Sequence, residues 1–133
     1  MTWLSRFAPQ LQSLIRVIFG LMFIEHGTQK LFGFPPLPAE MAHMHVPDQF
    51  KPVLLAAAVI EIMTGTLMTL GFFSRWAAFL ASGEMAVAYW LGHAMARGSL
   101  FPATNAGDAA VLYCFIFLYL AAAGPGPIAV NQK

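Results

Sequence analysis

Two apolar runs separated by two polar residues determine the fold that the sequence predicts: VLLAAAVIEIMTGTLMTLGFF at residues 53–73 and WAAFLASGEMAVAYWLGHAMA at residues 76–96. Each run has about the 20 residues that an α-helix needs to cross a bilayer. Both are too long and too continuous for barrel strands, and a helix satisfies every backbone polar group within its own segment. Since only Ser74 and Arg75 separate the runs, they predict an antiparallel hairpin of membrane-spanning helices.

Two further apolar runs flank this hairpin, at about residues 11–34 and 106–123. The sequence therefore predicts an all-α integral membrane protein, a bundle of four transmembrane helices in a single domain over residues 1–133. The Pro-rich segment PPLPAEMAHMHVPDQFKP, residues 35–52, joins the first two spans. The segment RGSLFPATN, residues 97–105, joins the last two.

The composition is typical of a membrane protein. Hydrophobic residues make up 59% and charged residues 10% of the 133 residues, whereas soluble domains carry about 25% charged residues. A net charge of +1 without a basic run argues against a nucleic-acid partner. Cys114 is the single cysteine, so an internal disulfide, a zinc–thiolate site and dithiol redox chemistry within the chain are excluded.

The distribution of positive charge predicts the orientation. An even number of spans places both termini on one side of the membrane. The terminal side carries Arg6, Arg75 and Lys133, with Arg16 nearby, and the opposite side carries Lys30, Lys51 and Arg97. This slight bias predicts cytoplasmic termini by the positive-inside rule. A cleavable signal peptide is not expected, because Arg16 interrupts the first apolar region and no small-residue cleavage site follows it.

Polar residues gather at the outer ends of three spans and predict one ligand-binding pocket there. The first span ends in IEHGTQKLFGF, residues 24–34. The residues expected to line the pocket are Glu25, His26, Gln29, Lys30, His93 and Asn105. They offer donors and acceptors, which suits a carbonyl-bearing or anionic head group.

Structural interpretations of the same side chains remain open. His26 and His93 could be capped imidazoles at the water interface. Lys30 could extend its ammonium to that interface. Asp108 could line the pocket, or it could cap the last helix, whose N-terminus favours an anion.

A second polar layer is expected near the middle of the membrane. Glu61 and Glu84 lie there on helix faces rich in small residues, with Arg16 toward the inner side. A charge at the bilayer centre costs at least ~2.5–3.5 kcal/mol, so such groups face the protein interior. The glutamates could carry protons or contact a ligand. Alternatively, they could form a structural network as protonated acids or as partners of Arg16.

The sequence predicts no complete metal site. Met41, His43, Met44 and His45 lie close together in the first loop, and thioether and imidazole groups are soft ligands suited to copper. No other segment offers further ligands to close such a site. An ordinary amphipathic loop explains the same residues.

The ordered motifs resemble the DoxX family of small four-helix membrane proteins. HGTQKLFG, residues 26–33, is similar to the HGxQKLFG signature of that family, and residues 65–94 and 101–127 resemble its later helices. The resemblance implies a multi-pass protein of the bacterial inner membrane. It also implies an association with redox systems, because one branch of the family is linked to a thiosulfate–quinone oxidoreductase and another to an oxidative-stress complex.

Three functions are therefore considered. The first is an accessory subunit of a redox system, with an internal polar pocket for a quinone or a similar small molecule. The second is a small proton-coupled transporter that uses Glu61 and Glu84. The third is a structural membrane partner or assembly factor. The absence of a nucleotide-binding, haem-attachment or dithiol motif favours an accessory role over a stand-alone enzyme. Quinone is the candidate cofactor, and a redox protein and a second copy of the chain are the candidate partners.

Overall fold

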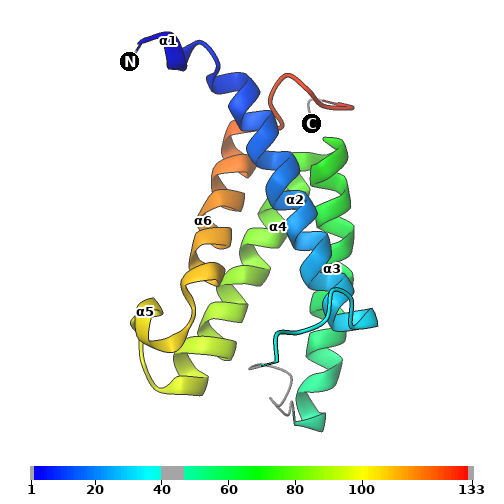
Figure 1. Cartoon of the computed structure of the whole chain (residues 1–133), viewed down its shortest axis with the longest axis vertical. Coiled ribbons are helices and arrows are strands. Elements are labelled where there is room, and N and C mark those ends of the chain that lie inside the picture. Colours follow the sequence, from blue (N-terminus) through cyan, green and yellow to red (C-terminus); the bar gives the residue numbers. More distant parts are fainter. Residues whose placement is uncertain (1, 40–46, 132–133) are drawn as a thin grey trace.

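The computed structural model describes residues 2–39 and 47–131, and these residues form helices and loops without a strand. The all-α prediction is confirmed for this part of the chain. The elements are α1 (Thr2–Ser5), α2 (Ala8–Phe32), η1 (Asp48–Phe50), α3 (Lys51–Leu70), α4 (Ser74–Val87), η2 (Ala88–Met95), α5 (Pro102–Asn105) and α6 (Asp108–Ala123). The longer helices run along the long axis of the molecule, and both termini lie at the same end (Figure 1).

Proline and glycine set the limits of α2 and α3. Each helix has a proline in its first turn, where the missing N–H has no helical partner to lose. The helices end at Gly33 and Gly71, which take left-handed conformations with φ of 66° and 73°. Glycine adopts such angles without the steric cost of a Cβ atom. The apolar runs continue past these glycines, so the helices end before the predicted limits of residues 34 and 73.

The helix predicted at residues 76–96 changes its hydrogen-bonding pattern part-way. It begins as the α-helix α4 and continues without a break as the π-helix η2. Hydropathy does not distinguish the two patterns, because both present an apolar surface. π-helical turns inside α-helices are rare and often lie at functional sites.

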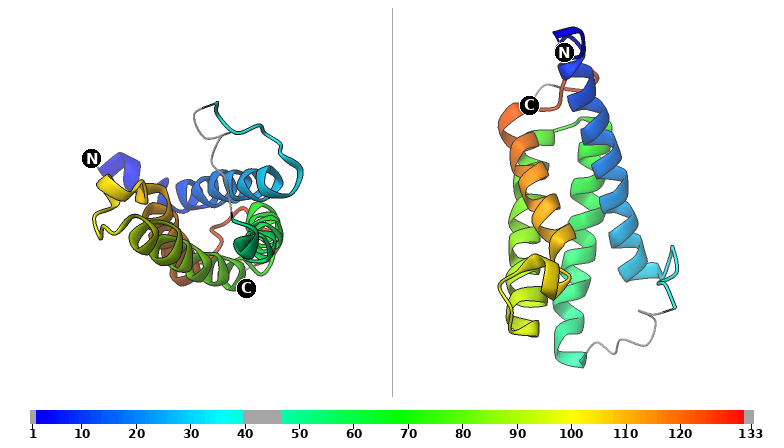
Figure 2. Two further views of the ribbon diagram at one scale, coloured as in Figure 1. Left: turned by 90° about the horizontal axis from the view of Figure 1, so that it is seen from below. Right: turned by 60° about the vertical axis from the view of Figure 1, so that its left-hand side comes forward.

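The helices pack in two pairs that meet through α3 and α4. α2 lies beside α3, and α4 lies beside α6 (Figure 2). Glycine allows the first pair to approach closely: a Cβ atom on Gly65 would lie 2.7 Å from the carbonyl oxygen of Gly20. The buried face of α3 consists of Ala58, Glu61, Thr64, Gly65 and Met68, as the small-residue face around Glu61 predicted.

Aromatic rings fill the space between α2 and α6. Phe23 and Phe117 are fully buried, and their ring centroids lie 4.8 Å apart in an edge-to-face arrangement. Outside this core, large apolar side chains cover the surface; Trp76 is 69% exposed and Phe115 is 65% exposed. Such extensive exposed apolar surface is unusual for a soluble monomer and suits contact with lipid.

Length and hydropathy identify one membrane-crossing candidate among the described helices. The continuous run Asp48–Leu70 is 23 residues long, with a mean hydropathy of 2.0 in its most apolar stretch. α6 is also apolar but shorter. By this criterion alone, the other long helices are not identified as spans.

Candidate functional site

An ion pair between α2 and α3 is the centre of the candidate site. The ammonium of Lys30, in the last turn of α2, contacts Oε1 of Glu61 on α3. Glu61 is buried, whereas the Lys30 side chain is 31% exposed. Gly27 brings the helices close enough for this pair, because a Cβ atom there would lie 2.8 Å from the Ala58 carbonyl oxygen. The ammonium thus contacts a buried carboxylate while part of the Lys30 side chain remains exposed.

Several buried polar atoms near this pair have no hydrogen-bond partner among the described residues. They are Oε2 of Glu61, both carboxyl oxygens of Glu84 and the hydroxyl of Tyr113. Glu84 lies within electrostatic range of Glu61 and Lys30, and Tyr113 lies within that range of Glu61. We call Lys30, Glu61, Glu84 and Tyr113 the buried polar cluster. Because buried polar groups in proteins are nearly always paired, these atoms mark a candidate binding site.

Tyr113 is the member of this cluster that sequence reasoning missed. It lies in the apolar run VLYCFIFLYL, residues 111–120, which also contains Tyr119. Tyr119 is exposed, whereas Tyr113 is buried against Phe23 and Phe117. The available signal was a phenol in the middle of an apolar helix, and hydropathy alone does not say which tyrosine faces inward.

The residues predicted to line the outer pocket have different neighbours in the structure. The His26 ring lies edge-on to Tyr113 at a centroid distance of 5.7 Å, close to the buried polar cluster. Gln29 instead donates a hydrogen bond to the Pro35 carbonyl at 3.1 Å. Glu25 is exposed. Among the described residues, the hydrogen bonds of Gln29 and His93 and the ring contact of His26 go to other partners, so a single pocket shared with His93 and Asn105 stays a prediction.

His93 and Asn105 belong to a structural corner between η2 and α6. Asn105 is buried; its amide donates to the Ser99 carbonyl at 2.8 Å, and its Oδ1 accepts the Gly107 N–H at 2.8 Å. Nδ1 of His93 lies 3.1 Å from the Asn105 carbonyl oxygen, which can only accept, so Nδ1 carries the proton. Asp108 is exposed at the first position of α6, which agrees with its interpretation as a helix-terminal residue.

Among the residues that the structure describes, Arg16 forms no ion pair with a glutamate. It is buried and donates to backbone carbonyls at the end of the molecule that carries the termini. Its Nε reaches Pro125 at 2.8 Å, and its terminal nitrogens reach Met68, Thr69 and Ile128. Of the alternatives left open for Glu61, the described residues show a pair with Lys30 as the cation and not with Arg16. The physical reason is that the segment after α6 folds back over the bundle and offers carbonyl oxygens close to Arg16.

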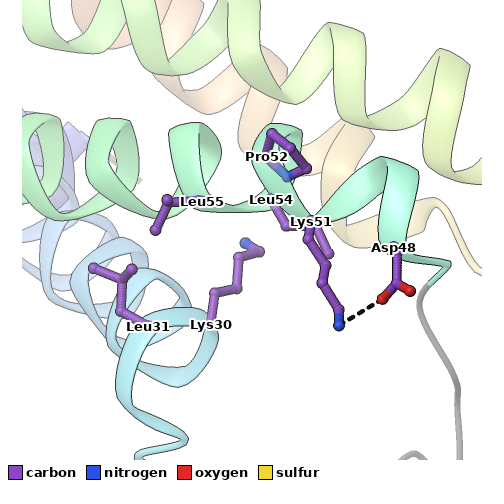
Figure 3. Close-up of a pocket in the computed structure, with 7 residues that line it drawn as sticks. All are labelled: Lys30, Leu31, Asp48, Lys51, Pro52, Leu54 and Leu55. Carbon is purple, nitrogen blue, oxygen red and sulfur yellow. Dashed lines mark ion pairs between the residues drawn. The ribbon is translucent and has the colours of Figure 1, made fainter.

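An open groove leads from the surface to the Lys30 ammonium. It has a volume of about 640 Å³ and lies between the end of α2 and the start of α3 (Figure 3). Its lining residues are Lys30, Leu31, Asp48, Lys51, Pro52, Leu54 and Leu55. Lys51 and Asp48 form an exposed ion pair at 2.6 Å. Lys30 therefore connects this groove, here called the Lys30 groove, with the buried polar cluster.

The proposed soft metal ligands Met41, His43, Met44 and His45 lie outside the described residues. Within residues 2–39 and 47–131, no group of three or more His, Cys, Asp or Glu side chains could hold a metal ion.

An apolar exterior around a buried ionisable cluster defines a small helical membrane protein. Comparison with known proteins agrees: the model of the DoxX family matches residues 11–94. A protein of Haemophilus influenzae with the name "Uncharacterized protein" is 40% identical over 131 residues, covering 98% of this chain and 95% of its own. The "Inner membrane protein YphA" of Escherichia coli is 32% identical, covering 94% of this chain and 91% of its own. The chain belongs to the DoxX family. No solved structure matches it.

Proposed function

We propose that the chain is a multi-pass protein of the bacterial inner membrane. In this proposal its single domain crosses the membrane four times, through α2, α3, the continuous α4–η2 helix, and α6. The printed name of the Escherichia coli relative supports the location. Both termini lie at the same end of the molecule, which supports an even number of crossings (Figure 1). The slight excess of positive residues at that end favours cytoplasmic termini.

Within that membrane, the buried polar cluster binds the carbonyl-bearing head group of a small molecule such as a quinone. The observation that carries this proposal is the set of buried oxygens without partners on Glu84 and Tyr113. A carboxyl group in its acid form and a phenol each donate one hydrogen bond, which suits carbonyl oxygens. The aromatic rings of Phe23 and Phe117 beside Tyr113 supply an apolar surround for a ring. The chain then serves as an accessory subunit that supplies a bound quinone to a redox protein.

A carbodiimide experiment tests this function. Dicyclohexylcarbodiimide enters membranes and reacts with buried carboxyl groups in their acid form. We expect it to modify Glu84, as measured by peptide mass spectrometry on the protein in lipid nanodiscs. A short-tail ubiquinone analogue should protect Glu84 from modification. Asp48 is the negative control within the chain: it is exposed and paired with Lys51, so it should stay unmodified with and without the quinone. Equal modification of Glu84 with and without the quinone would contradict quinone binding at the cluster.

Proton-coupled transport is a second candidate, favoured by the connection from the Lys30 groove through Lys30 and Glu61 toward Glu84. Under this function, Glu61→Gln and Glu84→Gln should each abolish proton-linked flux in proteoliposomes while the protein still inserts and folds.

A purely structural partner, working with another protein or a second copy of the chain, would tolerate both changes. Substitution by Leu would then lower thermal stability instead.

A further inference from the structure

The Lys30 groove has the size and the lining of a binding site for a small amphiphile. Its volume of about 640 Å³ lies within the range of ~300–1,000 Å³ that is typical of small-molecule sites. Leu31, Leu54, Leu55 and Pro52 offer an apolar surface. The charged groups that line it, Lys30, Lys51 and Asp48, carry two positive charges and one negative charge. The lining thus suits a short apolar tail with an anionic head.

The two lysines of the groove differ in what holds them. Lys51 pairs with Asp48, and the two side chains are 66% and 85% exposed, so this pair is weak and screened. Lys30 pairs with the buried Glu61 and yet borders the open groove. An anion in the groove can therefore compete with Glu61 for the Lys30 ammonium.

Resting on the proposed small-molecule function, we propose that the groove binds a carboxylate with a short apolar tail, and that this binding is coupled to proton uptake by Glu61. The carboxylate takes the Lys30 ammonium from Glu61, and Glu61 binds one proton from solution. The charges balance: one anion and one proton enter, and the ion pair Lys30–Glu61 becomes an ion pair between Lys30 and the ligand.

The surroundings of Glu61 explain why it binds a proton when the ligand takes its partner Lys30. A buried carboxylate without a cationic partner is costly, so it is neutralised when its partner leaves. The other ionisable groups in electrostatic range of Glu61 are His26 on α2, Glu84 on α4 and Tyr113 on α6. Glu84 and Tyr113 cannot supply a positive charge. His26 is exposed and, unlike these two groups, can carry a positive charge. The experiment therefore includes a His26 variant.

Hexanoate is the probe, and hexanamide is the uncharged control of nearly the same shape. Calorimetric titrations in zwitterionic nanodiscs, in buffers of different ionisation enthalpy, measure the affinity and the protons exchanged. We expect about one proton taken up per hexanoate bound at neutral pH. Hexanamide should bind more weakly and without proton uptake, because it cannot displace Glu61 from the ammonium.

Matched variants test which residues couple hexanoate binding to proton uptake. Glu61→Gln should bind hexanoate more tightly and without proton uptake, since Lys30 is then free. The double variant Lys30→Met/Glu61→Gln leaves no unpaired buried charge, so it should fold while losing about tenfold or more in affinity. Arg97→Met removes an exposed positive charge that does not line the groove, so it should change affinity by no more than about twofold. His26→Gln should keep the uptake.

Three results would overturn the inference: hexanoate binding without proton uptake, uptake that survives in Glu61→Gln, or equal affinity in the double variant. Quinone protection of Glu84 together with any of these would leave the proposed function in place while removing the anion site. Nanodiscs with phosphatidylglycerol test whether a lipid phosphate occupies the groove instead. Retained hexanoate binding there supports a free carboxylate as the occupant, and competition by that lipid would overturn that assignment.

Discussion

Arg16 and Glu84 are both ionisable side chains inside the helical assembly, but their surroundings give them opposite roles. Arg16 donates to carbonyls of four residues and has no glutamate partner. The two carboxyl oxygens of Glu84 have no partner among the described residues. A buried charge with all its partners stabilises one conformation, whereas buried polar atoms without partners often mark a site. This contrast supports the proposals that Arg16 stabilises the fold and that Glu84 binds a ligand.

Substitution of Arg16 should destabilise the protein without removing the site. In Arg16→Met, the carbonyls of Thr69 and Ile128 lose this donor, while Met68 still accepts the Gly71 N–H and Pro125 still accepts the Ser13 hydroxyl. A carbonyl left unpaired costs about 1–3 kcal/mol, so we expect a loss of roughly 2 kcal/mol or more. Thermal unfolding in detergent measures this loss. Arg6→Met is the control, because Arg6 is exposed and should be neutral. An unchanged melting temperature in Arg16→Met would contradict a stabilising role for the Arg16 hydrogen bonds. Loss of carbodiimide labelling of Glu84 in the folded variant would place Arg16 in the site.

At the scale of elements, the long helices could be predicted from the sequence and their exact ends could not. Apolar runs of about 20 residues predicted α3 and its neighbours, because that is the length a helix needs to cross a bilayer. The runs do not mark Gly33 and Gly71 as helix ends, since glycine is tolerated inside membrane helices. The π-helical turn of η2 leaves no signal in hydropathy either.

Close packing of α2 on α3 should depend on Gly65. A Cβ atom there would meet the Gly20 carbonyl oxygen at 2.7 Å and the Ile24 side chain at 2.9 Å. Overpacking of this kind typically costs about 1–3 kcal/mol, so Gly65→Ala should lower the unfolding temperature and weaken the Lys30–Glu61 pair. Gly83→Ala on α4 is the matched control, because nothing lies within 4 Å of its Cβ position. It should be neutral or stabilise by up to about 1 kcal/mol. Equal behaviour of the two variants would contradict the close approach.

At the scale of the whole molecule, the least predictable feature is how distant segments meet. The segment after α6 returns to the turn between α3 and α4, where the Asn131 N–H donates to the Gly71 carbonyl at 3.0 Å. Backbone carbonyls carry no sequence signature, so the partners of Arg16 could not be read from residue types. The Lys30–Glu61 pair was missed for a related reason. Rise per residue placed Lys30 at the outer end and Glu61 at mid-depth, but a lysine side chain is long enough to join the two levels.

The proposed topology is the last prediction, and it concerns the chain as a whole. Thr2 and Val130 lie toward the two termini at one end, whereas Gln49 lies in η1, directly before α3, whose start is at the opposite end (Figure 1). In a Cys114→Ser background, Thr2→Cys and Val130→Cys should resist a membrane-impermeant maleimide in intact cells and react after permeabilisation. Gln49→Cys, at an exposed position, should react in intact cells and serves as the control. Labelling of both terminal cysteines but not Gln49→Cys would reverse the orientation. Opposite behaviour of Thr2→Cys and Val130→Cys would mean an odd number of crossings, which four spans do not allow.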